Sequence, residues 1–297
     1  MKYLKDLPIG SKVRETKSNT LFLVADHDHT GWKGTTLAAD KICLISCIDA
    51  AEPMNPNAAA AQNGNNIYAL SNIHMWLNSA DENWYAPSHE YDMPPREEAI
   101  CSRCDVFRSR YFDPDGTFPP PYAYDKLPGY LSRFDKSFVD MIEESIIYAA
   151  GPTDPDIVNY GPPLAQKVKC RVFIPSCTEM GLENEIRQEG SLIRLFIDPR
   201  MRMCAPENGA IHRDENFVYK QSAAATWLRS PDGDDTGLCK IYQVEHKLGD
   251  IVGATAVSRP VNYAAGIRPV MNLSDGAPVS GRLKDGTYNI CKGKQYA

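Results

Sequence analysis

The C-terminal third of the chain begins with the stretch ATWLRSP at residues 225–231. It is an apolar, β-type run that contains a single arginine. Further short apolar runs follow at 237–244, 251–257, 266–273 and 287–291, and Gly, Asp and Pro residues separate them. Short β-type runs between turn residues are typical of strands. The pattern predicts a C-terminal third that is mostly β.

The N-terminal two thirds mix strands with short helices. β-type apolar runs occur at 21–25, 35–49 and 168–174. A helix is expected at 71–77, because Ser71 is a good N-cap and apolar residues recur there at i, i+3 and i+4. A second helix is expected from Leu131 onward, on the same spacing argument.

Five large apolar residues on these segments form the expected core: Trp76, Phe134, Phe138, Phe173 and Trp227. Ser176 and Glu179 fit a capping box that opens a short helix through Leu182, which gives Glu179 a structural role. By contrast, residues 87–128 have little periodicity and much proline, and they predict an irregular insertion. We therefore expect a single domain over residues 1–297, without a repeat array.

Composition limits the classes of function. The 297 residues are 43% hydrophobic and carry a net charge of −6. This charge argues against nucleic-acid binding, because phosphate contacts need a surplus of Lys and Arg. No apolar stretch reaches the roughly 20 residues of a membrane span, and the N-terminus lacks a signal-peptide core. We expect a protein made in the cytoplasm, without a signal peptide and without membrane insertion.

Several motifs occur in a recognisable order along the chain. They are SNIHMWLNS at 71–79, VFIPSCTEMGL at 172–182, WLRSP at 227–231 and GIRPVMNL at 266–273. In this order they resemble an uncharacterised domain family that is common in gut Firmicutes and their phages. The last two motifs also resemble the end of the C-type-lectin-like fold of formylglycine-generating enzymes and of the variable proteins of diversity-generating retroelements.

The strand and helix pattern predicts an α+β fold, and the resemblance implies a C-type-lectin-like core in which Arg229 and Arg268 belong to the scaffold. Residues 232–265 between them, the display segment, would then meet a ligand. The segment carries eight candidate binding residues: Asp232, Asp234, Asp235, Tyr242, His246, Arg259, Asn262 and Tyr263. Aromatic and short polar side chains of this kind are common in adaptable recognition surfaces. Ordinary solvated turns are the alternative for the segment, and anion binding is the alternative for the two arginines.

On this basis we expect a non-catalytic binding module that recognises a cell-surface carbohydrate or protein. A phage or prophage structural protein, on a tail or virion surface, fits the resemblance, and a retroelement-diversified variable protein is a narrower version of it. One open alternative is a cysteine- or metal-dependent enzyme related to formylglycine-generating enzymes, although Cys239 is the only cysteine in the display segment. Another is an architectural virion protein, a homo-oligomer whose interface covers Tyr242 and Tyr263.

Metal ligands and catalytic motifs are sparse in the sequence. Cys101 and Cys104 have the spacing of half a zinc site, but no second Cys-x-x-Cys completes it. The aspartates of the display segment offer oxygen ligands for calcium without the full loop pattern. His27 and His29 are expected on one face of a strand, as the two-residue period requires. A polar strand end that turns into Thr30-Gly31 is the expected role, and a shared metal, for which no third ligand is apparent nearby, is the alternative. With no Gly-x-Ser-x-Gly or His-Glu-x-x-His motif, we expect no catalytic residue and no cofactor, with structural zinc or calcium as the alternatives.

Overall fold

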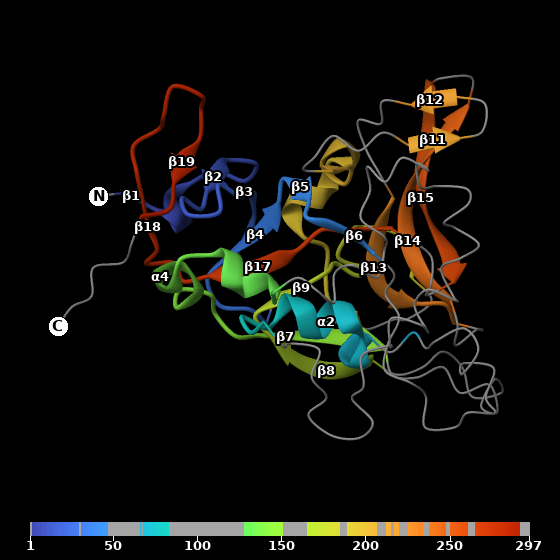
Figure 1. The fold of residues 1–297 in the computed structure, drawn as a ribbon, viewed down its shortest axis with the longest axis horizontal. Helices are drawn as coiled ribbons and strands as arrows, with labels where there is room; N and C mark the ends of the chain where they lie inside the picture. The colour runs from blue at the N-terminus through green and yellow to red at the C-terminus, as the bar shows by residue number, and fades with distance from the viewer. Residues whose placement is uncertain are drawn as a thin grey trace.

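The computed structural model describes residues 2–29, 31–46, 66, 68–82, 128–150, 165–184, 189–206, 212–214, 217–219, 225–233, 238–247, 250–260 and 265–291. Of the expected insertion at 87–128, only Pro128 lies within these ranges. The described part is mostly β, with two main sheets and short helices (Figure 1). None of its helices exceeds six residues, so the described part of the chain is a mostly β fold with a few short helices.

The larger sheet has six strands and joins distant parts of the chain. Its order is β19 (Tyr288–Asn289), β2 (Lys12–Arg14), β3 (Leu21–His27), β4 (Thr35–Ala39), β17 (Val270–Leu273) and β9 (Val172–Phe173). All neighbours are antiparallel except β19 and β2. Nearby, β1 (Lys2–Tyr3) pairs with β18 (Pro278–Val279), so residues close to the two ends of the chain lie side by side.

The second sheet has five strands and contains the display segment. Its order is β15 (Asp250–Pro260), β14 (Leu238–Lys247), β13 (Thr226–Pro231), β16 (Ala265–Ile267) and β6 (Leu44–Ser46). The run GIRPVMNL therefore forms two strands, β16 in this sheet and β17 in the other. Pro269 stands between them, and because proline lacks a backbone N–H it is suited to the point where the chain leaves one ladder for the next.

Smaller elements surround the two sheets. Three two-stranded pairs are β7 (Ser145–Ala150) with β8 (Ala165–Cys170), β5 (Lys41–Ile42) with β10 (Ala205–Pro206), and β11 (His212–Asp214) with β12 (Phe217–Tyr219). The helices are η1 (Leu4–Asp6), η2 (Tyr68–Leu70), α2 (Asn72–Leu77), η4 (Tyr130–Arg133), α4 (Lys136–Val139), η6 (Arg194–Ile197) and η7 (Pro199–Met201). No helix in the described ranges is both long and apolar enough to span a bilayer.

Local capping explains where the short helices begin. Ser71 Oγ accepts a hydrogen bond from the backbone N–H of His74 at 3.1 Å, which confirms Ser71 as the N-cap of α2. The single helix expected from Leu131 onward is instead split into η4 and α4. Asp135 causes the break, because its side chain accepts from the backbone N–H of Ser137 and starts a new helix there.

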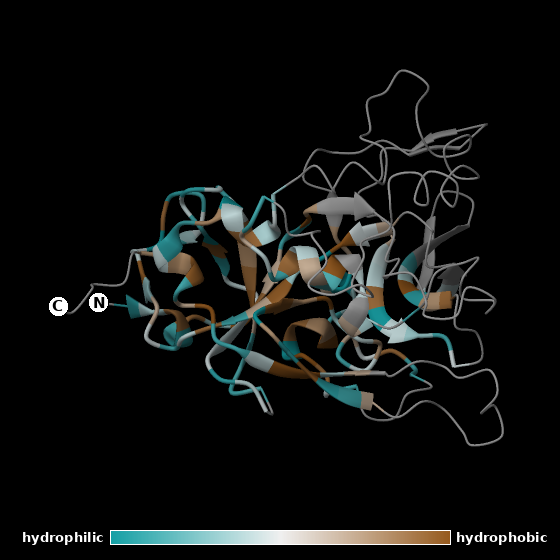
Figure 2. Cartoon of the chain, turned by 60° about the horizontal axis from the view of Figure 1, so that its bottom comes forward, coloured by the Kyte–Doolittle hydropathy of each residue, from teal (hydrophilic) through white to brown (hydrophobic). Residues whose placement is uncertain are grey.

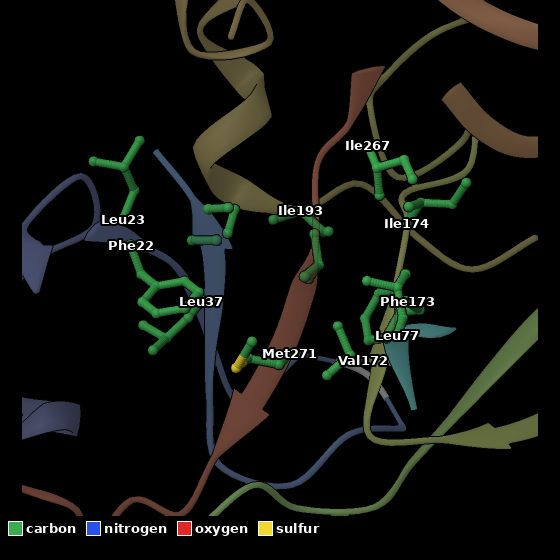
Figure 3. Packing of buried hydrophobic residues seen from close by; sticks show 14 of the residues in the cluster. Phe22, Leu23, Leu37, Leu77, Val172, Phe173, Ile174, Ile193, Ile267 and Met271 are labelled. Carbon is green, nitrogen blue, oxygen red and sulfur yellow. The ribbon is translucent and has the colours of Figure 1, made fainter. Parts of the chain in front are cut away.

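The expected core is confirmed. Trp76, Phe134, Phe138, Phe173 and Trp227 are all buried, and they belong to one cluster that includes side chains of both main sheets. Figure 2 shows the apolar stretches gathered on the strands and short helices in the middle of the molecule. Figure 3 shows side chains from β3, β4, β17 and β9 packed across neighbouring strands, with Met271 of β17 between Leu37 and Val172.

Candidate functional site

Arg229 is a scaffold residue. It is fully buried, and its Nε donates to the carbonyl of Tyr148 at 2.8 Å. Its Nη1 donates to the carbonyl of Ile174 and to Glu179 Oε2, while Nη2 donates to Glu179 Oε1 and the carbonyl of Glu189. These contacts use all five guanidinium N–H groups. Arg229 therefore has no N–H left for an external anion, and the structural interpretation holds.

Glu179 connects this scaffold to the segment 189–193. Its side chain accepts from the backbone N–H of Ser176, and Ser176 Oγ accepts from the backbone N–H of Glu179, which confirms the capping box. The residues that follow form turns rather than the expected helix. Ser176 Oγ also donates to the carbonyl of Glu189 at 2.6 Å, and the backbone N–H of Ile193 donates to the carbonyl of Glu179. The segment 189–193 is thus tied to the capping box at both ends.

Gly190 must be glycine in this segment. Its φ of +91° lies in the left-handed region, and a Cβ there would come within 2.6 Å of Glu179 Oε1. Only glycine adopts this φ without strain and lacks the Cβ atom that would clash with Glu179. Because the next residue is Ser191, the buried ion pair of Glu179 and Arg229 indirectly fixes the position of that serine.

Arg268 is also buried in the scaffold. Its Nε donates to the carbonyl of Ala39 at 2.9 Å, and Nη1 donates to the carbonyls of Met201 and Arg202. The guanidinium lies over the ring of Phe196, 5.1 Å from its centroid. Arg268 therefore ties the end of β4 to η7 at the point where β16 gives way to β17.

The described part of the display segment contains a polar cluster of Asp232, Lys240 and Ser258, which we call the Asp232 cluster. Lys240 Nζ lies 3.2 Å from Asp232 Oδ2 and donates to Ser258 Oγ at 2.8 Å, and Ser258 Oγ donates to Asp232 Oδ2. The side chains of Lys240 and Asp232 are 15% and 16% exposed. The cluster connects the residue after β13 with β14 and β15, and its charged groups remain in partial contact with solvent.

Tyr242 does not belong to this surface, which corrects its place among the candidate ligand-binding residues. It is 2% exposed, and its neighbour Ile241 is fully buried. β14 lies between β13 and β15, and it is covered on both faces at this point, so consecutive residues are buried. Burial raises the pKa of Tyr242 above its ordinary value.

The other candidate residues of the display segment are only partly placed. The backbones of His246 and Arg259 lie in β14 and β15, opposite Ile251 and Cys239. Asp234, Asp235, Asn262 and Tyr263 lie outside the described residues, as do Cys101 and Cys104 of the half zinc site. Within the described ranges, no three His, Cys, Asp or Glu side chains are grouped so that they could hold a metal ion.

The histidines near the end of β3 do not share a strand face, so the expected arrangement of His27 and His29 is wrong. β3 ends at His27, and Asp28 has a φ of +52°, which turns the chain before His29. His27 lies 2.8 Å through Nε2 from the carbonyl of Leu7. His29 lies 2.9 Å through Nδ1 from Asp26 Oδ2 and 3.1 Å through Nε2 from Ser191 Oγ.

Asp26, His29 and Ser191 form a second polar site, which we call the Asp26 site, and sequence reasoning missed it. His29 and Ser191 are 162 residues apart, and no local motif marks Ser191. A register shift in β3 between Val24 and Asp26 precedes the site. Such irregularities re-aim side chains near functional sites, and only the tertiary contact reveals the serine.

Comparison with known proteins places the chain in a family without supplying an activity. A family model described as "Domain of unknown function (DUF6273)" matches residues 28–275. No curated protein and no solved structure matches the chain.

Proposed function

The chain belongs to the DUF6273 family, and from this premise we propose that it is a ligand-binding module that acts through its display segment, residues 232–265. The ligand is a cell-surface carbohydrate or protein. The module has a C-type-lectin-like core and is carried on the tail or surface of a phage particle after synthesis in the cytoplasm. A retroelement-diversified variable protein and a homo-oligomer are compatible with this role.

One observation carries the proposal: the scaffold arginines are buried and engaged in internal contacts, whereas the Asp232 cluster retains partial contact with solvent. Arg229 uses all its guanidinium N–H groups internally, and Arg268 donates through Nε and Nη1 to backbone carbonyls. The Asp232 cluster joins three adjacent strands and is partly exposed. A carboxylate, an ammonium and a hydroxyl held in one place match the hydroxyl groups of a sugar or the polar groups of a protein surface.

The platform under this cluster is long and well paired. β14 and β15 have 10 and 11 residues and pair from Leu238 opposite Pro260 to Lys247 opposite Asp250. Figure 1 shows them on the side of the molecule away from the two termini. A rigid ladder of this kind lowers the ordering entropy that is lost when the segment binds.

Cysteine chemistry is not favoured by the thiol of the display segment. Cys239 is fully buried, and burial raises its pKa far above its ordinary value. The reactive form of cysteine is the thiolate, which this environment suppresses. The formylglycine-type enzyme alternative therefore finds no support in the only cysteine of the display segment.

A binding screen with matched variants tests the proposal. The purified chain is applied to glycan and cell-surface protein arrays, together with Lys240→Ala and Lys12→Ala. Lys12 Nζ lies 3.2 Å from Asp40 Oδ2, the same separation as in the Lys240–Asp232 pair, but in the other sheet. We expect a specific ligand that Lys240→Ala loses and Lys12→Ala keeps. The absence of any specific ligand, or equal effects of the two variants, would overturn the proposal.

A further inference from the structure

We infer that Asp26, His29 and Ser191 form an acyl-transfer centre that hydrolyses carboxylic esters with a small acyl group. The side chains follow one another in the order carboxylate, imidazole, hydroxyl. Asp26 Oδ2 lies 2.9 Å from His29 Nδ1, and His29 Nε2 lies 3.1 Å from Ser191 Oγ. Both separations are within hydrogen-bond reach, as a nucleophile and its general base require. This activity is separate from ligand binding by the display segment.

Asp26 is equipped to orient the imidazole. Burial alone would raise the pKa of Asp26, but hydrogen bonds from His29, from Arg194 and from the backbone N–H of His27 lower it to about 2. The carboxylate is therefore ionised at neutral pH and accepts the Nδ1–H of His29. In that tautomer Nε2 carries a lone pair and accepts the hydroxyl proton of Ser191.

The ring of His29 is held in this orientation by packing. It stacks on the indole of Trp32 with a centroid separation of 4.1 Å, and Trp32 Nε1 donates to the carbonyl of Ile146 at 3.0 Å. Asp26 is fixed in turn, because the backbone N–H and Nε of Arg194 both donate to its carboxylate. A general base held on two sides loses little entropy when it acts.

Ser191 lies at the solvent boundary rather than in the core. Ser191 is half-buried, and its neighbours Gly190 and Leu192 are exposed. Among the described residues, no acceptor receives a hydrogen bond from the backbone N–H groups of Gly190, Ser191 or Leu192. Consecutive N–H groups beside a nucleophile can stabilise the oxyanion of an acyl-transfer intermediate.

The reaction balances without a cofactor. Ser191 Oγ attacks the ester carbonyl carbon, and its proton passes to His29 Nε2. The bond from carbon to the alcohol oxygen breaks, and the alcohol leaves with the proton from His29. Water then attacks the acyl-serine, His29 takes and returns its proton, and the acid and free Ser191 are released. The sum is ester plus water giving carboxylic acid plus alcohol.

The surroundings of Ser191 indicate a small acyl group. Leu192, 40% exposed, offers an apolar contact beside the nucleophile. His29 and Ile193 beside it are buried, so we expect the acyl group to lie on the exposed side of Ser191, next to Leu192. An acetyl ester, whose methyl group contacts Leu192 while the alcohol faces solvent, meets both conditions.

Covalent labelling with a fluorophosphonate probe tests the inference directly. The whole chain is treated with the probe, and the modified residue is identified by mass spectrometry, alongside the rate of 4-nitrophenyl acetate hydrolysis. We expect one probe per chain on Ser191. Ser191→Ala and His29→Gln should lose the label and lower the hydrolysis rate at least about a hundredfold, the usual scale for removal of a general base or its nucleophile.

Ser18→Ala is the matched control. Ser18 Oγ donates to Glu15 Oε2 at 2.6 Å, so Ser18 has a carboxylate partner but no imidazole. This variant should label and hydrolyse like the parent protein. An unlabelled Ser191 in the folded protein, or an unchanged rate in Ser191→Ala, would overturn the inference and leave the contacts as structural. If His29→Gln does not fold, Ser191→Ala still decides, because it removes only one half-buried hydroxyl.

Discussion

Arg229 and Glu179 form a two-contact ion pair that is completely buried. Arg229 lies in β13 of the five-stranded sheet, and Glu179 lies in the turns that follow β9 of the six-stranded sheet. The pair therefore joins the two sheets, and through Gly190 it also sets the place of Ser191. The same buried ion pair therefore supports both the display segment and the Asp26 site.

Breaking this pair should be costly. Glu179→Gln removes the carboxylate that pairs with both Nη atoms of the buried Arg229, and breaking a buried pair in this way typically costs about 3–5 kcal/mol. Urea unfolding of the variant measures the change. Lys12→Ala, which removes a half-exposed lysine paired with Asp40, should cost less than about 1 kcal/mol. Equal losses in the two variants would contradict the structural role of the buried pair.

Gly190→Ala should destabilise the protein more than Gly10→Ala. Both glycines have positive φ values, +91° and +83°, so each alanine has a conformational cost of about 1–2 kcal/mol. Only at Gly190 would the new Cβ also approach Glu179 Oε1 to 2.6 Å, whereas nothing lies within 4 Å at Gly10. Thermal unfolding of the two variants compares them, and a smaller loss for Gly190→Ala would show that the segment 189–193 is placed differently.

The stability of the protein should fall in acid partly because of Asp26. The pKa of Asp26 is lowered from 3.8 to about 2, the net result of burial, which raises it, and of hydrogen bonds from His29 and Arg194, which lower it more. A lowered carboxyl pKa stabilises the folded state above pH 3.8, and that contribution is lost as the pH falls toward 2. The difference in unfolding free energy between the parent and Asp26→Asn should therefore shrink by about 2 kcal/mol between pH 5 and pH 2. A constant difference would contradict this account.

Asp26 should act as a positioning residue for the ester hydrolysis proposed above. Asn in its place carries no charge to stabilise the imidazolium, and its NH2 group can donate to Nδ1 of His29 and so favour the wrong tautomer. Asp26→Asn should lower kcat about 10²–10⁴-fold with little change in KM, and it should alter the pH profile of Ser191 labelling. A variant that loses stability but keeps the parent kcat and pH profile would assign Asp26 a structural role alone.

The described thiols should differ in reactivity according to burial. Burial raises the pKa of Cys170 to about 12, and that of Cys239 far above its ordinary value. Cys43 and Cys291 are only half-buried. Disulfide exchange with a chromogenic reagent, mapped by mass spectrometry, should modify Cys43 and Cys291 first and spare Cys170 and Cys239 until denaturant is added. Early modification of Cys239 would contradict its position in the core.

Local sequence signals correctly predicted the start of a helix or turn where the side chain of one residue caps the backbone. Ser71 begins α2 because its hydroxyl replaces a missing backbone acceptor, and Ser176 with Glu179 makes a capping box for the same reason. The prediction of one helix from Leu131 onward was wrong, because the spacing of apolar residues indicates which face of a helix is buried but not where the helix ends. Asp135 made the break by capping a new helix.

Placement of the candidate sites was harder to predict. Tyr242 has the composition of a recognition residue, yet β14 is covered on both faces at that point and Tyr242 is buried. His27 and His29 are two residues apart, as on one strand face, but the positive φ of Asp28 turns them toward different partners. Neighbouring strands and turn geometry decided these positions.

The sequence by itself determined the mostly β C-terminal third, the apolar residues of the core and the capping residues Ser71, Ser176 and Glu179, because periodicity, capping and the burial of large apolar side chains depend on local sequence. Only the tertiary structure decided that Glu179 is the partner of Arg229 and that Ser191 meets His29. Such contacts join residues that are 50 and 162 positions apart. Their partners are selected by the packing of whole sheets, which no local pattern encodes.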